Sequence, residues 1–190
     1  MTAEPVDPAA PESACPAPAA SPTPEPPSTD WEQRTAAAWT RLDELDEAEF
    51  RDLIDKLVAE LPPDSAIGAF ERACAFDSTG HSDKAVPLYQ EALERGLTSI
   101  RRRRATIQLS SSLRNIGRPE EGVRLLTPEL DAESDELDDA VRATLALCLA
   151  NLGREREGLA LVLGALAPHL PRYQRSMANY ARLLVEPDSD

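Results

Sequence analysis

The sequence DSTGHSDKA, residues 77–85, returns in altered form as RNIGRPEEG at residues 114–122 and as ANLGREREG at residues 150–158. Each stretch has a glycine at its fourth place and a small residue five positions later. The glycines lie 37 and 36 residues apart. A fixed period of this length is typical of helical solenoids. We therefore expect an all-α fold in which helix hairpins stack along the chain.

Each repeated stretch predicts a corner between two helices. A glycine just past a helix takes the left-handed conformation that satisfies the last free carbonyls. The corner glycines are Gly80, Gly117 and Gly153. Ser82 is expected to cap the next helix in the first corner, and Pro119 fits the first turn of the helix in the second. The small residues let two helices cross closely, and they are Ala85, Gly122 and Gly158.

These corners resemble those of tetratricopeptide repeats, whose pattern has small residues at positions 8, 20 and 27 and large ones at 11 and 24. With Gly80 at position 15, the first repeat starts at Ala66 and matches at Ala73, Phe76, Ala85, Tyr89 and Ala92. The second, from Arg103, matches at Ser110, Leu113, Gly122 and Leu126, with Glu129 where Ala is usual. The third, from Asp139, matches at Ala146, Leu149, Gly158, Val162 and Ala165. The Trp-Leu pair usual at positions 4 and 7 is absent. The resemblance spans about residues 66–168 and is to a divergent bacterial type.

The resemblance implies a right-handed superhelix whose concave groove binds a peptide or partner protein without catalysis. In such repeats the first helix of each hairpin lines the groove through positions 2, 5, 9, 12 and 13. The candidate groove residues carried over in this way are Phe70, Arg104, Ile107, Ser111, Arg114, Asn115, Leu147 and Asn151. Phe70 and Leu147 are expected to supply contact area. Arg104 and Arg114 are expected to receive an acidic segment or a C-terminal carboxylate. The Lys/Asn set with which some family members clamp a chaperone's C-terminus is absent, because Phe70 and Cys74 occupy its leading positions.

The charge balance argues against two classes of partner. The 190 residues carry a formal net charge of −14, which opposes general attraction to nucleic acid or to anionic membranes. No apolar run approaches the length of a membrane span, and the N-terminal residues lack the charged region and following apolar region of a secretory leader. We expect a cytoplasmic protein that does not associate with a membrane.

No motif in the sequence predicts an enzyme, a metal site or a cofactor. Phosphate-binding loops, dinucleotide fingerprints, HExxH and paired CxxC motifs are all missing. The three cysteines, Cys15, Cys74 and Cys148, have no disulfide or metal spacing, and the last two fit a helical apolar pattern. A Cys–His pair brought together by folding stays open as an alternative.

The composition divides the chain into five parts. Residues 1–29 hold nine of the seventeen prolines and predict a disordered tail with polyproline II character. Its PxxP spacings leave open a role as a ligand for a proline-recognising domain. Residues 30–63 predict an N-terminal helical cap or a degenerate leading repeat, beginning with a helix capped by Asp30. Residues 64–168 hold three hairpins, with helices at about 65–79, 82–95, 98–116, 119–130, 135–152 and 155–168. A last helix within 169–185 is expected to cover the third repeat with Tyr173, Met177 and Tyr180, and residues 186–190 form an acidic tail.

The run Arg101-Arg102-Arg103-Arg104 allows three interpretations. Consecutive helical positions point in different directions, so the four side chains cannot share one ligand. Arg104 belongs to the groove set above. Pairing of the cluster with acids such as Glu94, Asp138 and Asp139 is the plainer interpretation. Single-stranded RNA binding, known for another helical repeat family of similar period, is the alternative function.

Overall fold

A computed structural model describes residues 27–186 as an all-helical structure. The α-helices are α1 (Thr29–Trp39), α2 (Glu47–Val58), α3 (Ala66–Ser78), α4 (Ser82–Glu94), α5 (Ser99–Asn115), α6 (Pro119–Leu126), α7 (Asp138–Asn151), α8 (Glu155–Leu166) and α9 (Gln174–Leu183). Two short 3₁₀ helices, η1 (Thr127–Asp131) and η2 (Ala167–His169), follow α6 and α8. The expected Pro-rich tail, apart from its last three residues, and the last four residues of the acidic tail lie outside the described residues. None of the helices within residues 27–186 is long and apolar enough to cross a membrane.

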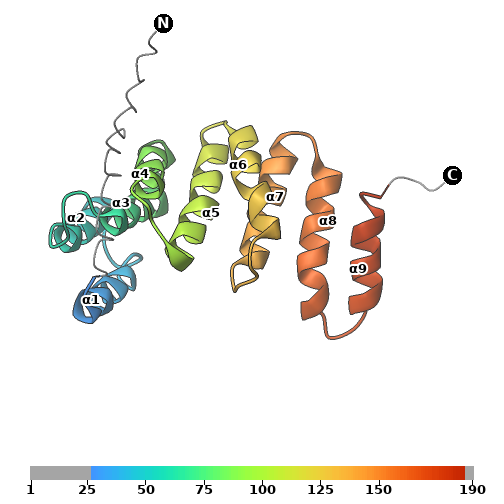
Figure 1. Ribbon diagram of the computed structural model, residues 1–190, viewed down its shortest axis with the longest axis horizontal. Coiled ribbons are helices and arrows are strands. Elements are labelled where there is room, and N and C mark those ends of the chain that lie inside the picture. Colours follow the sequence, from blue (N-terminus) through green and yellow to red (C-terminus); the bar gives the residue numbers. More distant parts are fainter. Residues whose placement is uncertain (1–26, 187–190) are drawn as a thin grey trace, which may run out of the picture.

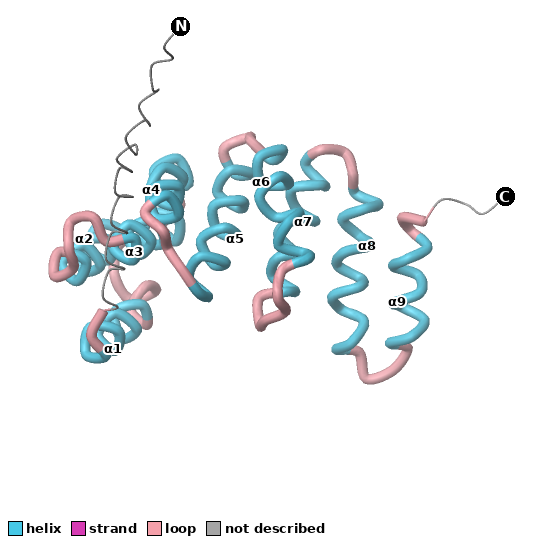
Figure 2. Tube along the Cα trace, in the orientation of Figure 1, coloured by secondary structure: helices cyan, strands magenta, loops and turns pink. Residues whose placement is uncertain are grey.

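The helices form hairpins that follow one another along a solenoid (Figure 1). Hairpins α3–α4, α5–α6 and α7–α8 stand side by side; residues 95–98 join the first to the second, and the longer segment 127–137, which includes η1, joins the second to the third (Figure 2). The first helices pack in series, α3 on α5 and α5 on α7, and each second helix also packs on the next first helix. The all-α solenoid of helix hairpins expected from the 36–37-residue period is confirmed.

The three corners share one backbone geometry. Gly80, Gly117 and Gly153 have φ angles of 79°, 80° and 72°, in the left-handed region that favours glycine. The residue after each glycine donates its N–H to the carbonyl five residues earlier, over 2.9, 2.8 and 3.0 Å. This bond closes the preceding helix as a Schellman motif does. Ser82 is the first residue of α4 and makes no capping bond; its hydroxyl donates to Asp77 instead.

Small residues hold the helices of each hairpin in close contact. Ala85 is fully buried, and a Cβ atom added at Gly122 of α6 would lie 3.1 Å from the carbonyl oxygen of Ser110 in α5, and 2.7 Å from Cys148 Sγ in the following helix, α7. A Cβ atom at Gly158 would lie 2.9 Å from the carbonyl oxygen of Ala146. Tyr89 and Leu126, one turn further along α4 and α6, are fully buried beside these contacts. The crossings are therefore close enough to require a small side chain.

Several helix ends differ from the sequence-based expectation, each for a local reason. Ser28, in extended conformation, caps α1 by accepting from the N–H of Trp31, so the expected cap Asp30 lies inside the first turn. The helix expected to reach residue 130 stops at Leu126 and continues as η1, because Pro128 has no N–H to donate.

The last helix, α9, does not take the place of a fourth first helix. It packs against α8 and η2 instead of stacking on α7 as α5 stacks on α3. Tyr173 and Tyr180 are 75% and 59% exposed, although the sequence pattern predicts that they cover the third repeat. Tyr173 itself has a φ angle of 69°, which turns the chain into α9. The helical pattern placed α9 correctly in sequence but did not give its direction of approach.

Candidate peptide-binding groove

Three of the four consecutive arginines of α5 are paired with acids on neighbouring elements, and Arg101 and Arg102 are the first two. Arg101 contacts Glu32 of α1 over 2.5 Å. Arg102 contacts Glu129 of η1 over 2.8 Å. Their guanidinium groups therefore hold the α5 helix to its neighbours.

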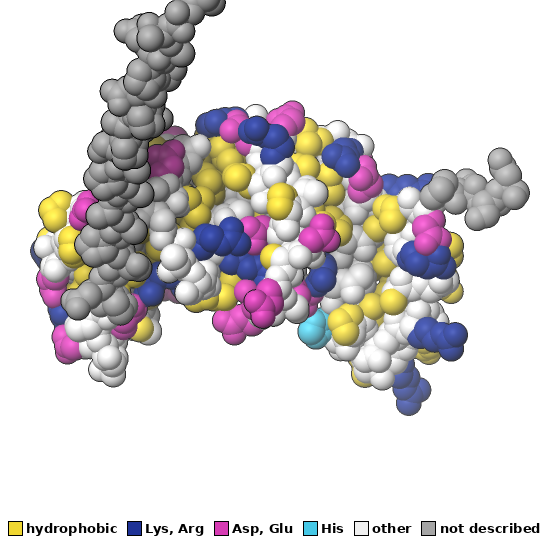
Figure 3. All heavy atoms as spheres, viewed as in Figure 1, with side chains coloured by type: hydrophobic (Ala, Val, Ile, Leu, Met, Phe, Trp, Pro, Cys, Tyr) yellow, Lys and Arg dark blue, Asp and Glu magenta, His cyan; other side chains and the backbone are white. Residues whose placement is uncertain are grey.

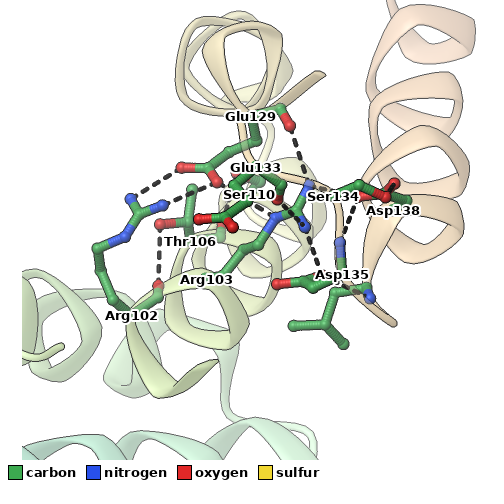
Figure 4. Close-up of polar contacts among 10 residues, drawn as sticks. Arg102, Arg103, Thr106, Ser110, Glu129, Glu133, Ser134, Asp135 and Asp138 are labelled. Atoms are coloured by element: carbon green, nitrogen blue, oxygen red, sulfur yellow. Dashed lines mark hydrogen bonds and ion pairs between the residues drawn. The ribbon is translucent and has the colours of Figure 1, made fainter. Parts of the chain in front are cut away.

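Arg103 is the centre of a buried ion-pair network (Figure 4). The side chain is almost fully buried, and it pairs with Glu129, Asp135 and Asp138. Its Nη2 lies 2.9 Å from Asp138 and donates to the Glu129 carbonyl over 3.0 Å. Hydrogen bonds from Ser134 and Arg103 hold the pKa of Asp138 below its ordinary value. The network fastens η1 and the loop before α7 to the start of α5.

Glu129 is the residue of this network that the sequence could have revealed. It occupies the repeat position where Ala is usual, and its side chain is 7% exposed. A carboxylate at such a buried position requires a cation, since an unpaired charge there is costly. The sequence analysis recorded the departure from Ala but did not connect it to Arg103. Of the expected acid partners, Asp138 is used, whereas Glu94 and Asp139 are not among the contacts of the cluster.

Arg104 remains on the surface of α5. Its guanidinium lies 5.3 Å from the centre of the Phe70 ring, and it makes no ion pair with an acid among residues 27–186. Phe70 beneath it is fully buried, so this ring offers no contact area to a ligand, contrary to expectation. Ile107 is also buried, in a core cluster with Leu126 and Val141. Phe70 and Ile107 both occupy position 5 of their repeats. They are buried because the first helix of the following hairpin packs over this position.

Arg114 is held in place at the other end of α5. Its Nη2 donates to Asn115 Oδ1 over 2.9 Å, and Asn115 Nδ2 donates to Ser82 Oγ over 3.2 Å. No acid in the described part of the chain forms an ion pair with Arg114. Ser111, one turn earlier, is half-buried. The hydrogen bonds connect Arg114 to the first corner of the solenoid.

The accessible candidates lie on two adjacent helices. Arg104, Ser111, Arg114 and Asn115 have the spacing i, i+7, i+10 and i+11, which places them on one face of α5. On α7, Leu147 is 50% exposed and Asn151 follows one turn later, also exposed. We call these six residues the α5–α7 surface.

The cysteines and histidines lie in separate environments. Burial raises the pKa of the Cys74 thiol to about 12, and it also raises the pKa of Cys148. A thiol with a raised pKa is a poor nucleophile. His81 contacts Glu47 over 3.3 Å, and His169 contacts Asp139 over 2.9 Å. Neither histidine contacts a cysteine within residues 27–186.

Comparisons with known proteins agree with this architecture. A family model described as a tetratrico peptide repeat matches residues 66–184. The crystal structure of a putative kinesin light chain from Podosopora anserina with nearly identical TPR-like repeats superposes with a TM-score of 0.61. The two chains are 17% identical over 82% of this chain and 92% of that one. A variant of the same repeats gives 0.57 and 14% identity over 82% and 94%. These two likenesses establish the fold alone.

No curated protein matches the sequence. The family match covers more than half of the chain and agrees with the three hairpins and the three glycine corners described above. The chain therefore belongs to the tetratrico peptide repeat family.

Proposed function

We propose that the α5–α7 surface binds a peptide segment of a partner protein. Repeats of this family generally serve as protein–protein interaction modules. The observation that carries the proposal is that the arginines on α5 differ in whether they form ion pairs. Arg101, Arg102 and Arg103 are paired with acids, whereas Arg104 and Arg114 form no ion pair within residues 27–186.

The two arginines favour a ligand with negative charge at two points. They lie ten residues apart on one helix, which is about 15 Å along the axis. A guanidinium binds a carboxylate through two parallel hydrogen bonds, and this favours an acidic segment or a C-terminal carboxylate. Leu147 on α7 adds apolar contact area, and Asn115 and Asn151 add amide groups that bind a peptide backbone.

The same proposal assigns the protein a non-catalytic role in a reducing compartment, for which we propose the cytoplasm. Cys74 and Cys148 are both buried free cysteines, and they pack as small apolar side chains. The α1–α2 pair is proposed to close the N-terminal end of the solenoid.

The proposal is tested by measuring peptide binding to a variant in which the two arginines of the α5–α7 surface are replaced by glutamate. Fluorescence anisotropy with a labelled peptide array, each peptide made with a free and with an amidated C-terminus, identifies binders. For these binders, Arg104→Glu combined with Arg114→Glu is expected to weaken binding at least tenfold, about 1.4 kcal/mol. Amidation separates recognition of the terminal carboxylate from recognition of acidic side chains.

The control is a variant with the same change in net charge, made outside the α5–α7 surface. Lys56→Glu on α2 combined with Arg124→Glu on α6 changes two exposed cations to anions. Equal loss of binding in both variants, or no loss in the groove variant, contradicts the proposed site. Binding of single-stranded RNA that falls steeply with salt supports the alternative function instead.

A further inference from the structure

Large exposed hydrophobic side chains gather at the C-terminal end of the solenoid. Ten such residues occur in the part of the chain that the structure describes, and eight of them lie on or after α7. These eight are Leu147, Leu159, Val162, Leu166, Tyr173, Tyr180, Leu183 and Val185; the other two are Ile100 and Ile116. In the view of Figure 3, hydrophobic side chains reach the surface over α8 and α9. A cluster of this kind is typical of an interaction surface.

The repeat register explains why this end is uncovered. Val162 of α8 occupies the same repeat position as Tyr89 of α4 and Leu126 of α6. Tyr89 and Leu126 are fully buried, and α4 and α6 each pack against the next first helix, α5 and α7. Val162 is 41% exposed because α9 approaches α8 from a different side. The third hairpin therefore presents a face that is built to be covered by another helix.

The side chains of α8 show from which side α9 approaches. Ala160, Leu161 and Gly164 of α8 line a cavity of about 520 Å³ together with Ala178 and Ala181 of α9. The exposed residues are different ones: Leu159, Val162 and Leu166 have the spacing i, i+3 and i+7, which places them on one face of α8. The cavity and the exposed stripe therefore lie on different sides of the helix.

Helix α9 carries an exposed stripe of its own. Tyr180 and Leu183 lie one turn apart on α9 and are 59% and 49% exposed. Since α9 runs beside α8 (Figure 1), we define the C-terminal apolar face as Leu159, Val162, Leu166, Tyr180 and Leu183. This face thus holds both an uncovered helix and an amphipathic helix that offers apolar side chains. A surface with both properties is self-complementary, as a two-fold interface requires.

The charge distribution shows at which end two copies of the chain meet with the least repulsion. The chain as a whole carries a net charge of −14. Residues 140–186, however, hold six arginines and three glutamates, so this segment is weakly positive. Two copies that meet elsewhere bring strongly acidic segments together, whereas contact at this end brings together only two weakly positive segments.

We propose that two copies of the chain associate through the C-terminal apolar face, with the α8–α9 pair of each copy packed on that of its partner about a two-fold axis. The proposal is separate from peptide binding, since it uses neither Arg104 nor Arg114. A dimer of this form carries two α5–α7 surfaces, and a partner with two peptide segments then binds both with higher avidity.

Sedimentation velocity of the full chain between about 1 and 100 µM tests the proposal, because dimerisation depends on concentration. The wild-type chain is expected to reach twice the monomer mass. Val162→Glu combined with Tyr180→Glu is expected to sediment as a monomer at every concentration, with unchanged helicity by circular dichroism. Ile100→Glu combined with Ile116→Glu is the matched control, with two exposed apolar residues changed elsewhere, and it is expected to remain a dimer.

Three results overturn the proposal: a monomeric wild-type chain at all concentrations, a dimer that survives the face variant, or equal dissociation of the control. If the double variant loses helicity, Tyr180→Arg alone replaces it, since that side chain is mostly exposed and its change leaves the core intact. Peptide binding by the monomeric variant is expected to equal that of the wild-type surface. The two proposals can therefore fail independently.

Discussion

At the scale of single residues, glycine has two distinct roles within α8. Gly158 lies where α8 crosses α7, and an added Cβ would meet a backbone carbonyl oxygen. Gly164 lies six residues later in the same helix, and an added Cβ would have nothing within 4 Å. The repeat pattern explains Gly158 as a packing residue, whereas Gly164 opens onto the cavity between α8 and α9.

This difference predicts opposite effects of the same substitution. Gly164→Ala is expected to raise the free energy of unfolding by about 1 kcal/mol, because alanine is the better helix former. Gly158→Ala brings the same gain in propensity but is expected to be destabilising overall, because overpacking costs about 1–3 kcal/mol. Urea unfolding followed by circular dichroism measures both. A Gly158→Ala variant as stable as the wild type would show that the crossing has room for a methyl group.

At the scale of elements, the Arg103 network shows how an irregular segment is attached to a regular repeat. Eleven residues, 127–137, separate α6 from α7, and the corner loops are much shorter. Arg103 reaches from α5 to Glu129 in η1, to Asp135 in the loop before α7 and to Asp138 at the start of α7. The α-helix expected to start at residue 135 starts at Asp138, since Asp135 lies in the loop and bonds to Arg103 and the Leu137 N–H.

Removing Arg103 while its acidic partners remain is expected to destabilise the fold. Arg103→Met leaves Asp135 and Asp138 without this cation and leaves Glu129 paired with Arg102 alone, so it is expected to lower the free energy of unfolding by about 1–3 kcal/mol. Arg103→Met combined with Glu129→Ala restores the usual small residue and removes the buried charge, so it is expected to recover part of the loss. Thermal and urea unfolding of the two single variants and the double variant give the coupling energy. Additive effects of the two substitutions would contradict direct pairing.

At the scale of the whole molecule, one buried carboxylate connects the N-terminal pair to the repeats. Glu71 of α3 accepts a hydrogen bond from Trp39 Nε1 over 2.8 Å and lies 3.8 Å from Arg101 of α5. Burial raises the pKa of Glu71 above its ordinary value of 4.5, although Trp39 and Arg101 favour the ionised form. Its position joins α1, α3 and α5 in a single body.

The raised pKa predicts how stability changes with pH. A carboxyl group with a higher pKa in the folded chain binds more protons when folded, so its contribution to stability falls as pH rises above 4.5. Glu71→Gln keeps an acceptor for Trp39 without the charge, and it is expected to flatten this fall. Urea unfolding at pH values from about 5 to 8 measures the effect.

Glu60→Gln is the control for this measurement. The hydrogen bond from Arg34 lowers the pKa of Glu60, so its contribution is present above 4.5 and lost as pH falls through the lower value. This variant is therefore expected to leave the slope between pH 5 and 8 unchanged. An unchanged slope in Glu71→Gln as well would show that Glu71 has no raised pKa.

The candidate site was predictable in part. The repeat register correctly located Arg104 and Arg114 on one helix, because side-chain direction follows from position in a helix. The register did not distinguish these accessible arginines from Phe70 and Ile107, which occupy repeat positions expected to line the groove but are buried. Nor did it show that Arg101, Arg102 and Arg103 are paired, because their partners lie 26 to 69 residues away in sequence.

The amino-acid sequence alone determined the hairpins, their period and their corners, since a left-handed glycine and a small crossing residue act through bonds and contacts close in the chain or within one hairpin. The tertiary structure decided which charges are paired and where α9 lies. Both depend on contacts between elements far apart in sequence, for which a repeat pattern holds no information. The exposed C-terminal apolar face follows from the position of α9, and so does the dimer that we propose.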